Sequence, residues 1–255
     1  MIANYHTHTW RCNHASGKEE EYVKAALKRG LQILGFSDHT PYLFPGSYYS
    51  HFRMKPQQLE GYCNTVLQLR QKYQEQMDIR LGLETEYYPA LFAELMAFLR
   101  NSPVEYMILG QHFLGNEEGD FYTGAPTGDA SALKRYCAQA MDAMQTGLFS
   151  YFAHPDLICY RGSKQLYMEQ MRRLCREANN CGMPLEINLH GLREGRNYPG
   201  KLFWQIAAEE GCKAILGSDA HEVWHLEETR TETAARKMAE KLGVTLLDTI
   251  VLRKI

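Results

Sequence analysis

Histidine and acidic residues recur at short spacings in this chain, and they are the residues that could do chemistry. His6 and His8 near the start of the chain, and Asp219 and His221 near its end, each form a pair two positions apart. Side chains two positions apart in a strand point to the same face, so each pair could bind one cation. Imidazole and carboxylate groups are the usual protein ligands of zinc, iron and manganese. The two pairs therefore predict a metal site.

Further candidate ligands are spread along the chain, each at or just beyond the end of a short apolar run. The nine plausible ligands are His6, His8, His14, His39, Glu84, His112, His154, Asp219 and His221. One ion needs three or four protein ligands, so this number suggests two or three metals that share a bridging carboxylate. An isolated histidine is usually structural, as we expect for His51 and His225. Many ionisable groups on one face, however, would be costly to bury without cations.

These side chains need a framework that brings distant residues together, and the apolar pattern predicts one. Strands are expected at Ile2–His6, Ile33–Ser37, Ile79–Glu84, Tyr106–Gly110, Ser150–Ala153, Leu185–Asn188 and Ala214–Ser218, with a further edge strand at Thr245–Leu252. Helices are expected at Lys18–Arg29, Gln57–Gln76, Ala90–Arg100, Ala130–Gln145, Lys164–Cys181, Gly200–Glu210 and Leu226–Leu242. This alternation predicts a parallel α/β architecture, either a closed barrel or a doubly wound sheet. In both, ligands bind at the carboxyl ends of the strands, where the candidate residues fall.

Composition narrows the class of protein. The chain has 255 residues, of which 45% are hydrophobic and 23% charged, as in one large globular domain, so we expect a single domain over residues 1–255. The net charge of −2 shows no basic excess for binding nucleic acid, and no apolar run is long enough to span a membrane. The seven cysteines form no C-x-x-C pair, and the first residues do not look like a signal peptide. We therefore expect reduced thiols and a cytoplasmic location.

In their order along the chain, the polar motifs resemble those of the polymerase and histidinol phosphatase (PHP) superfamily. The motifs are HTH at 6–8, the histidine at 14, GFSDHTP at 35–41, GLETEY at 82–87, GQH at 110–112, HPD at 154–156 and GSDAH at 217–221. They cover nearly the whole chain. The histidinol-phosphatase branch is the most similar, because of SDHTP at 37–41, C-x-H at 12–14 and EIN at 186–188. The chain departs from that branch at His190, an additional imidazole after the EIN motif.

The resemblance implies a fold and a set of metal ligands. The implied fold is an α/β single domain, a distorted (β/α)7 barrel similar to a TIM barrel, with three zinc, iron or manganese ions at the carboxyl ends of its strands. In the implied ligand sets, His6, His8, Glu84 and Asp219 hold the first ion, Glu84, His112 and His154 the second, and His14, His39 and His221 the third.

The resemblance also implies an activity, the hydrolysis of a small phosphate monoester, most closely histidinol phosphate in histidine biosynthesis. Neighbouring metals can lower the pKa of a shared water, and the resulting hydroxide would attack the phosphorus. Asp38 could orient a ligand imidazole from behind.

Several residues are candidates for contacting this substrate. A guanidinium can bind phosphate through two hydrogen bonds, and Arg161, in the loop after the fifth strand, is our first choice. Arg193 and Arg196 are weaker choices in the loop after the sixth strand. His190 and Tyr42 could also line the substrate pocket.

Three other functions fit parts of the pattern. A phosphoesterase of the same superfamily could act on another small ester or a nucleotide. An amidohydrolase-type enzyme also uses two histidines on its first strand, but it typically has eight strands and a bridging lysine, whereas the third strand here ends in Glu84. A metal-storage or regulatory module would need the same ligands without turnover.

Overall fold

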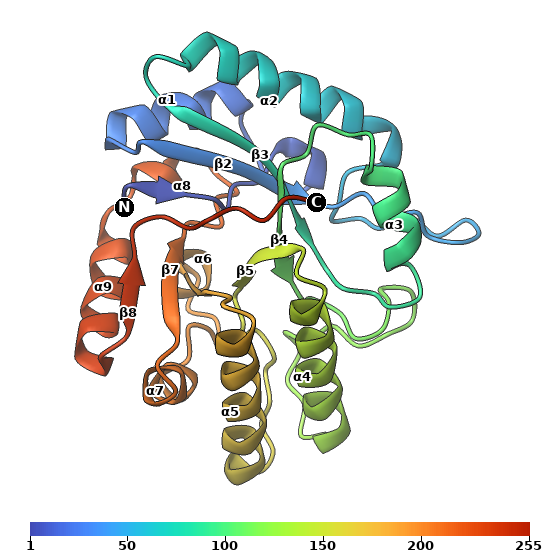
Figure 1. Ribbon diagram of the computed structural model, residues 1–255, viewed down its shortest axis with the longest axis vertical. Helices are drawn as coiled ribbons and strands as arrows, with labels where there is room; N and C mark the ends of the chain where they lie inside the picture. The colour runs from blue at the N-terminus through green and yellow to red at the C-terminus, as the bar shows by residue number, and fades with distance from the viewer.

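The computed structural model describes all residues 1–255, and its centre is one sheet of eight strands. Every strand is parallel to its neighbours, and the strands pair in the order in which they occur in the chain (Figure 1). They are β1 (Ala3–Asn4), β2 (Ile33–His39), β3 (Asp78–Thr85), β4 (Tyr106–Gly110), β5 (Phe149–Ala153), β6 (Leu185–Asn188), β7 (Lys213–Gly217) and β8 (Thr245–Leu247). Each of the seven apolar runs predicted as a strand contains a strand in the structure, because each is buried on both faces of the sheet.

The sheet curls until the segments that follow β1 and β7 meet. Thr7 and Ala220 form a parallel bridge there, and the backbone N–H of His8 donates to the carbonyl of Ala220 at 2.9 Å. β8 pairs instead with the beginning of β7, where Lys213 lies opposite Thr245. The predicted α/β barrel is therefore confirmed, with the expected edge strand added beside its seventh strand.

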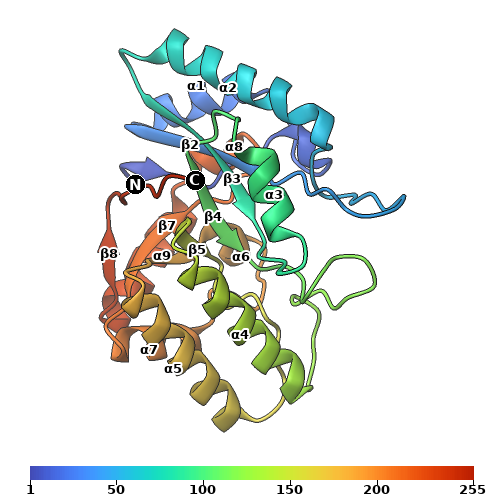
Figure 2. The same cartoon turned by 45° about the vertical axis from the view of Figure 1, so that its right-hand side comes forward.

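Helices connect consecutive strands and cover the outside of the sheet (Figure 2). The longer ones are α1 (Glu19–Arg29), α2 (Leu59–Tyr73), α3 (Phe92–Leu99), α4 (Ala130–Gln145), α5 (Lys164–Asn180), α7 (Lys201–Glu209) and α9 (Arg230–Leu242). Four short helical segments are η1 (Trp10–Cys12), η2 (Pro56–Gln58), α6 (Leu189–Arg193) and α8 (Trp224–Glu227).

One predicted helix is divided in the structure. The expected helix over Leu226–Leu242 is interrupted at Glu228, whose backbone is extended with φ −71° and ψ 129°. The carboxylate of Glu228 accepts a hydrogen bond from the backbone N–H of Thr231 at 2.7 Å. This contact satisfies a free N–H at the start of α9, so a new helix begins there.

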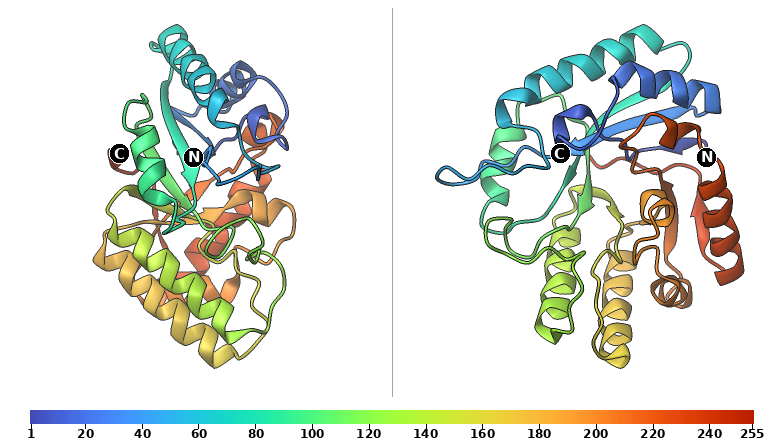
Figure 3. Two further views of the ribbon diagram at one scale, coloured as in Figure 1. Left: turned by 90° about the vertical axis from the view of Figure 1, so that its right-hand side faces the viewer. Right: turned by 180° about the vertical axis from the view of Figure 1, so that it is seen from behind.

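An apolar cluster, separate from the main core, fills the interior of the barrel toward the amino ends of the strands and reaches Ala153 at the end of β5. Seven buried residues form this cluster, namely Ala3, Tyr5, Tyr106, Ile108, Tyr151, Ala153 and Ile215. Ile250 and Leu252 of the C-terminal segment pack against the cluster. That segment crosses the strands in the view of Figure 1 and lies behind them when the molecule is turned round (Figure 3). Polar chemistry is thereby restricted to the opposite, carboxyl end of the strands. No helix in the structure is both long enough and apolar enough to cross a bilayer.

Candidate metal centre

Imidazole and acidic side chains from nearly the whole chain meet where the strands end. Glu84 lies in β3 and His39 is the last residue of β2, whereas the other predicted ligands lie in segments that follow strands. Several groups of three ligand atoms lie within 4.8 Å of one another. The contacts bring together all nine predicted residues, which are His6, His8, His14, His39, Glu84, His112, His154, Asp219 and His221.

Glu84 lies at the centre of this arrangement, and one of its oxygens faces the first predicted ligand set. Its Oε2 is 3.5 Å from the Nε2 atoms of both His6 and His8. Asp219 Oδ1 is 3.5 Å from Nε2 of His6 and 3.2 Å from Nε2 of His8. Two imidazole nitrogens and two carboxylate oxygens therefore point toward a common centre.

The other oxygen of Glu84 faces the second set. Its Oε1 is 2.7 Å from Nε2 of His154 and 3.6 Å from Nε2 of His112. Because its two oxygens face different imidazole pairs, Glu84 has the geometry of a carboxylate that joins two neighbouring cation sites.

The third set surrounds the outer part of the centre. The Nε2 atoms of His14 and His221 are 2.9 Å apart, and ligand atoms of His14, His39 and His221 lie within 4.8 Å of one another. Nδ1 of His39 also lies 3.0 Å from Oε2 of Glu84, so this set adjoins the first.

Several imidazoles are held in place through Nδ1, the ring nitrogen that faces away from the centre. Nδ1 of His6 contacts Glu186 Oε1 at 2.8 Å, and Nδ1 of His112 contacts Glu86 Oε1 at 2.8 Å. Such contacts fix the tautomer and leave Nε2 free to face the centre.

Of two supporting acids, one was predicted from the sequence and the other was not. Asp38, predicted to orient an imidazole, lies 3.4 Å from Nδ1 of His8. Glu186 was not among the predicted site residues, although it shares a strand face with Asn188 at the carboxyl end of β6. That position was the available signal. Glu186 also accepts hydrogen bonds from the His154 backbone at 3.0 Å and the Asn188 side chain at 2.9 Å.

Two residues of the centre have unusual backbone conformations. His154 has φ 34° and Asp219 has φ 48°, both in the left-handed region that most side chains avoid. Conformations of this kind persist where the surrounding structure enforces them, and they cluster at functional sites.

The centre contains buried polar atoms without partners, which is the observation that tests its fit to a metal. They include Nε2 of His6, Nε2 of His8, Oε2 of Glu84 and Oδ1 of Asp219, and no hydrogen-bond partner serves any of them. These are the atoms that converge in the first ligand set. Leaving such groups unsatisfied in a protein interior is costly, so the donor set fits a cation bound between them.

The electrostatics favour ionised carboxylates in the centre. Burial opposes ionisation of Glu84, but the imidazoles of His112, His39 and His6 outweigh it and hold the pKa of the carboxyl well below its usual range. Burial also opposes ionisation of Asp219, and the neighbouring His6 and His8 rings lower its pKa in the same way. Both acids therefore present negative charge to a cation at neutral pH.

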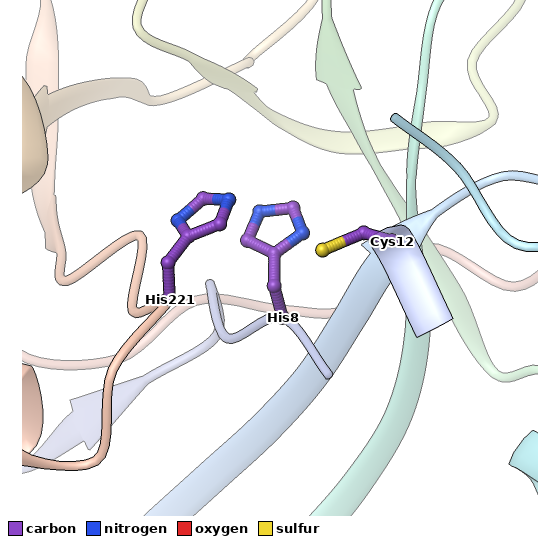
Figure 4. A group of neighbouring side chains, drawn as sticks. All are labelled: His8, Cys12 and His221. Atoms are coloured by element: carbon purple, nitrogen blue, oxygen red, sulfur yellow. The ribbon is translucent and has the colours of Figure 1, made fainter. Parts of the chain in front are cut away.

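Cys12, which is not among the nine predicted ligands, is an additional neighbour of the centre. Its Sγ, a ring nitrogen of His8 and a ring nitrogen of His221 form one of the close groups (Figure 4). The His8 and His221 rings stack with centroids 4.1 Å apart. Burial raises the pKa of the Cys12 thiol strongly.

A cavity of about 430 Å³ opens over the centre. Besides candidate metal ligands, it is lined by Phe52, Phe113, Tyr122, His190, Arg196 and Tyr198. Two of the predicted substrate contacts, His190 and Arg196, therefore face the cavity.

The other predicted substrate contacts lie elsewhere. Arg161, our first choice for phosphate, borders a separate hollow with Lys164 and Lys201. Arg193 borders another hollow, over the ring of Trp224 at 5.6 Å. Tyr42 is buried behind the cavity, where its hydroxyl donates to the carbonyl of Glu86. None of these three lines the cavity over the centre.

Comparison with known proteins gives a consistent result. The family model for the PHP domain matches residues 4–190. A probable histidinol-phosphatase of Deinococcus radiodurans is 32% identical over 227 residues, covering 87% of this chain and 86% of the relative. The histidinol-phosphatase of Bacillus subtilis is 27% identical over 251 residues, covering 85% of this chain and 92% of the relative.

A solved structure has a similar fold. It is the histidinol phosphate phosphatase of Lactococcus lactis subsp. lactis, complexed with zinc, L-histidinol and phosphate, and the TM-score is 0.76. The two sequences are 21% identical, and the match covers 98% of this chain and 96% of the other. Because the PHP model spans most of the chain and a relative exceeds 30% identity over most of its length, the chain belongs to the PHP domain family.

Proposed function

We propose that this chain is a metal-dependent phosphatase that hydrolyses L-histidinol phosphate to L-histidinol and inorganic phosphate, a step of histidine biosynthesis. The observation that carries the proposal is the set of unpartnered buried nitrogen and oxygen atoms around Glu84, at the base of an open cavity. The names of the relatives from Deinococcus radiodurans and Bacillus subtilis, and the ligands in the Lactococcus lactis structure, support the choice of substrate.

The proposal includes three metal ions per chain, each zinc, iron or manganese. We assign His6, His8, Glu84 and Asp219 to the first ion, Glu84, His112 and His154 to the second, and His14, His39 and His221 to the third. When bound, such ions supply positive charge next to the phosphoryl oxygens and make a water molecule acidic enough to be the nucleophile. The chain's own residues must then bind and orient the ester.

Arg196 is the residue that we assign to the phosphate. It is the one arginine that lines the cavity, and its Nη1 donates to the hydroxyl of Tyr198 at 3.2 Å, which steadies the guanidinium. The Tyr198 ring in turn packs 5.7 Å from the ring of His154. A phosphate held by Arg196 would therefore lie next to the His154 side of the centre, in a position to be attacked.

Another part of the cavity lining suits a flat ring. Phe52 and Phe113 stack with centroids 5.7 Å apart, and Phe52 meets the ring of His112 edge to face at 6.1 Å. Aromatic side chains offer large apolar area and prefer to pack against other rings. The imidazole ring of the L-histidinol leaving group would fit this wall when the phosphate lies toward Arg196.

The proposed location is the cytoplasm. All seven cysteines are free thiols in the structure, and six of them are buried. Free cysteines in this number are typical of a reducing compartment. The single domain over residues 1–255 and a small ester as the only substrate, without nucleic acid, are part of the same proposal.

The decisive experiment measures phosphate release from L-histidinol phosphate, nucleoside monophosphates and an oligonucleotide, together with metal content. His8→Ala and Asp219→Ala should each abolish hydrolysis and lower metal content, while the far-ultraviolet spectrum stays unchanged. His51→Ala is the matched control, because His51 is an exposed imidazole outside the cavity. Full activity in both His8→Ala and Asp219→Ala would refute the metal mechanism. Preference for another ester would refute the substrate.

The choice of arginine has its own test. Arg196→Ala should raise KM for L-histidinol phosphate and lower kcat/KM by at least about 100-fold, in line with the loss of a charged group at the reacting centre. Arg161→Ala should leave both constants unchanged, because Arg161 borders a different hollow. The reverse pattern would restore Arg161 as the phosphate ligand.

A further inference from the structure

Arg53 is a fully buried arginine that no step of the proposed reaction uses. It lies between β2 and α2 and is 1% exposed. Its guanidinium is enclosed by rings, with Phe52 at 4.5 Å, Tyr42 at 5.5 Å and Phe44 at 5.8 Å from the ring centroids. An arginine is rarely buried to this extent unless its charge is compensated, so its partners show what it does.

One partner connects Arg53 to the metal centre. Arg53 Nη2 lies 3.0 Å from Oε1 of Glu86, and the same oxygen contacts Nδ1 of His112 at 2.8 Å. Glu86 is fully buried, and its other oxygen has no partner. The position of this carboxylate, and through it the orientation of the His112 ring, therefore depends on Arg53.

A second partner connects Arg53 to the long loop after β4. Arg53 Nε donates to Oε2 of Glu117 at 2.8 Å, and Nη2 contacts the same oxygen. Glu117 is 5% exposed, although it belongs to a loop at the mouth of the cavity. A third contact, from Nη1 to the carbonyl of Thr40 at 2.7 Å, fixes the backbone next to His39.

These contacts also reach the aromatic wall. Phe52 precedes Arg53 in sequence and Phe113 follows His112, and the two rings stack in the cavity lining. The guanidinium therefore ties together both segments that carry the wall. Only a planar group with donors in three directions can make these contacts at once, and lysine cannot replace it.

We propose that Arg53 is a positioning residue, which orients His112 through Glu86 and fixes the Phe52–Phe113 wall through Glu117. The inference rests on the proposed function only in taking His112 as a metal ligand and the wall as a substrate contact. The two arms have separable consequences. Loss of the Glu86 arm disturbs metal binding and kcat, whereas loss of the Glu117 arm disturbs substrate binding and KM.

The test compares three conservative variants in the purified full-length protein: Arg53→Lys, Glu86→Gln and Glu117→Gln. Arg53→Lys and Glu86→Gln should weaken zinc binding, measured by calorimetric titration of metal-depleted protein with zinc chloride, by about 10–100-fold for one class of site. Glu117→Gln should leave zinc binding unchanged and raise KM for L-histidinol phosphate several-fold at nearly constant kcat. Arg80→Lys is the matched control, because Arg80 pairs with Asp78 at the amino end of β3.

Zinc affinity and KM within error of the Arg80→Lys control in all three variants would overturn the proposal. So would a loss of zinc binding in Glu117→Gln equal to that in Glu86→Gln, because the arms would then not be separable. If Arg53→Lys fails to fold, the two glutamine variants, which keep acceptor oxygens, still decide the matter. If the unmodified protein does not hydrolyse the ester, the proposed function fails, but the zinc titrations still test the Glu86 arm.

Discussion

The interior of the barrel has two layers that are built from the same strands and hold opposite kinds of side chain. At the amino ends, inward positions carry the apolar cluster around Tyr106 and Tyr151. At the carboxyl ends, inward positions carry Glu84, Glu186 and the imidazoles around them. The change from apolar to polar side chains takes place over a single two-residue repeat of a strand. The strands therefore fix where each side chain lies. Only the type of side chain makes one layer an apolar core and the other a reactive centre.

Glycine makes both layers possible, for different reasons. A Cβ on Gly82 would lie 2.3 Å from the ring of Tyr106, so glycine there admits a bulky apolar side chain. A Cβ on Gly110 would lie 2.1 Å from Oε1 of Glu84, so glycine there admits the central carboxylate. Substitutions in the carboxyl layer should therefore change chemistry, whereas substitutions in the amino layer should change stability.

Glu84→Gln is the strongest test of this contrast. Glu84 touches both predicted imidazole pairs, and the amide removes the charge that would hold cations in the first two sites. We expect phosphatase activity to fall by at least about 10³-fold, more than the loss of one neutral hydrogen-bond donor costs an enzyme. The thermal midpoint of the metal-depleted protein should not fall. Activity near that of the unmodified enzyme would remove Glu84 from the centre of the mechanism.

Glu186→Gln should have an intermediate effect on activity. The carboxylate holds Nδ1 of His6 at 2.8 Å but does not face the cavity. Groups that orient a metal ligand from behind typically contribute 10–100-fold to metal affinity or activity, and we expect a loss of about that size. Metal content and kcat measure it. A loss as complete as that in Glu84→Gln would mean that Glu186 itself binds a metal.

Gly82→Ala tests the apolar layer. The added methyl group overlaps the Tyr106 ring, which is fully buried and cannot move without disturbing its neighbours. Overpacking of this kind costs about 1–3 kcal/mol, and we expect a decrease in the free energy of unfolding of that size. Urea denaturation measures it. kcat per folded molecule should be unchanged at low temperature, and a large loss of kcat would show that the two layers are coupled.

Tyr106→Phe should produce the smallest effect. The Tyr106 hydroxyl donates to the carbonyl of Tyr5 at 2.9 Å, and its ring meets the Tyr5 ring edge to face at 6.2 Å. Only the contacts of the hydroxyl are lost, to the carbonyl of Tyr5 and, at 3.3 Å, to that of Phe36, so unfolding should become easier by about 0.5–1.5 kcal/mol, with kcat and metal content unchanged. Denaturation of this variant beside Gly82→Ala separates the hydrogen bond from the packing of the ring. A change in metal content would contradict the separation of the layers.

The sequence predicted the strands and the candidate ligands for a physical reason. Buried parallel strands are continuous apolar runs, and their carboxyl ends lie together whatever their order in the chain. The residues at those ends, from His6 to His221, could therefore be grouped before any distance was known. The longer helices were predicted in the same way, except at Glu228, where a side-chain contact ends one helix and starts another.

The loops were not predictable to the same degree. The sequence favoured Arg161 over Arg193 and Arg196 as the phosphate contact, yet of the three only Arg196 lines the cavity. Tyr42 and Arg53 lie in a loop rich in Pro, Gly and Tyr, and nothing in their spacing shows that both are buried. Loop conformation depends on contacts between segments distant in the chain, and no periodicity records those contacts.

The amino-acid sequence by itself determined the parallel α/β framework and the kinds of side chain at its carboxyl ends, because hydrophobic period and residue type are local properties. Only the tertiary structure decided that Glu84 faces two imidazole pairs, that Glu186 supports His6 and that Arg53 joins two loops to His112. Each of these is a contact between residues far apart in the chain, and its existence depends on how the whole barrel closes.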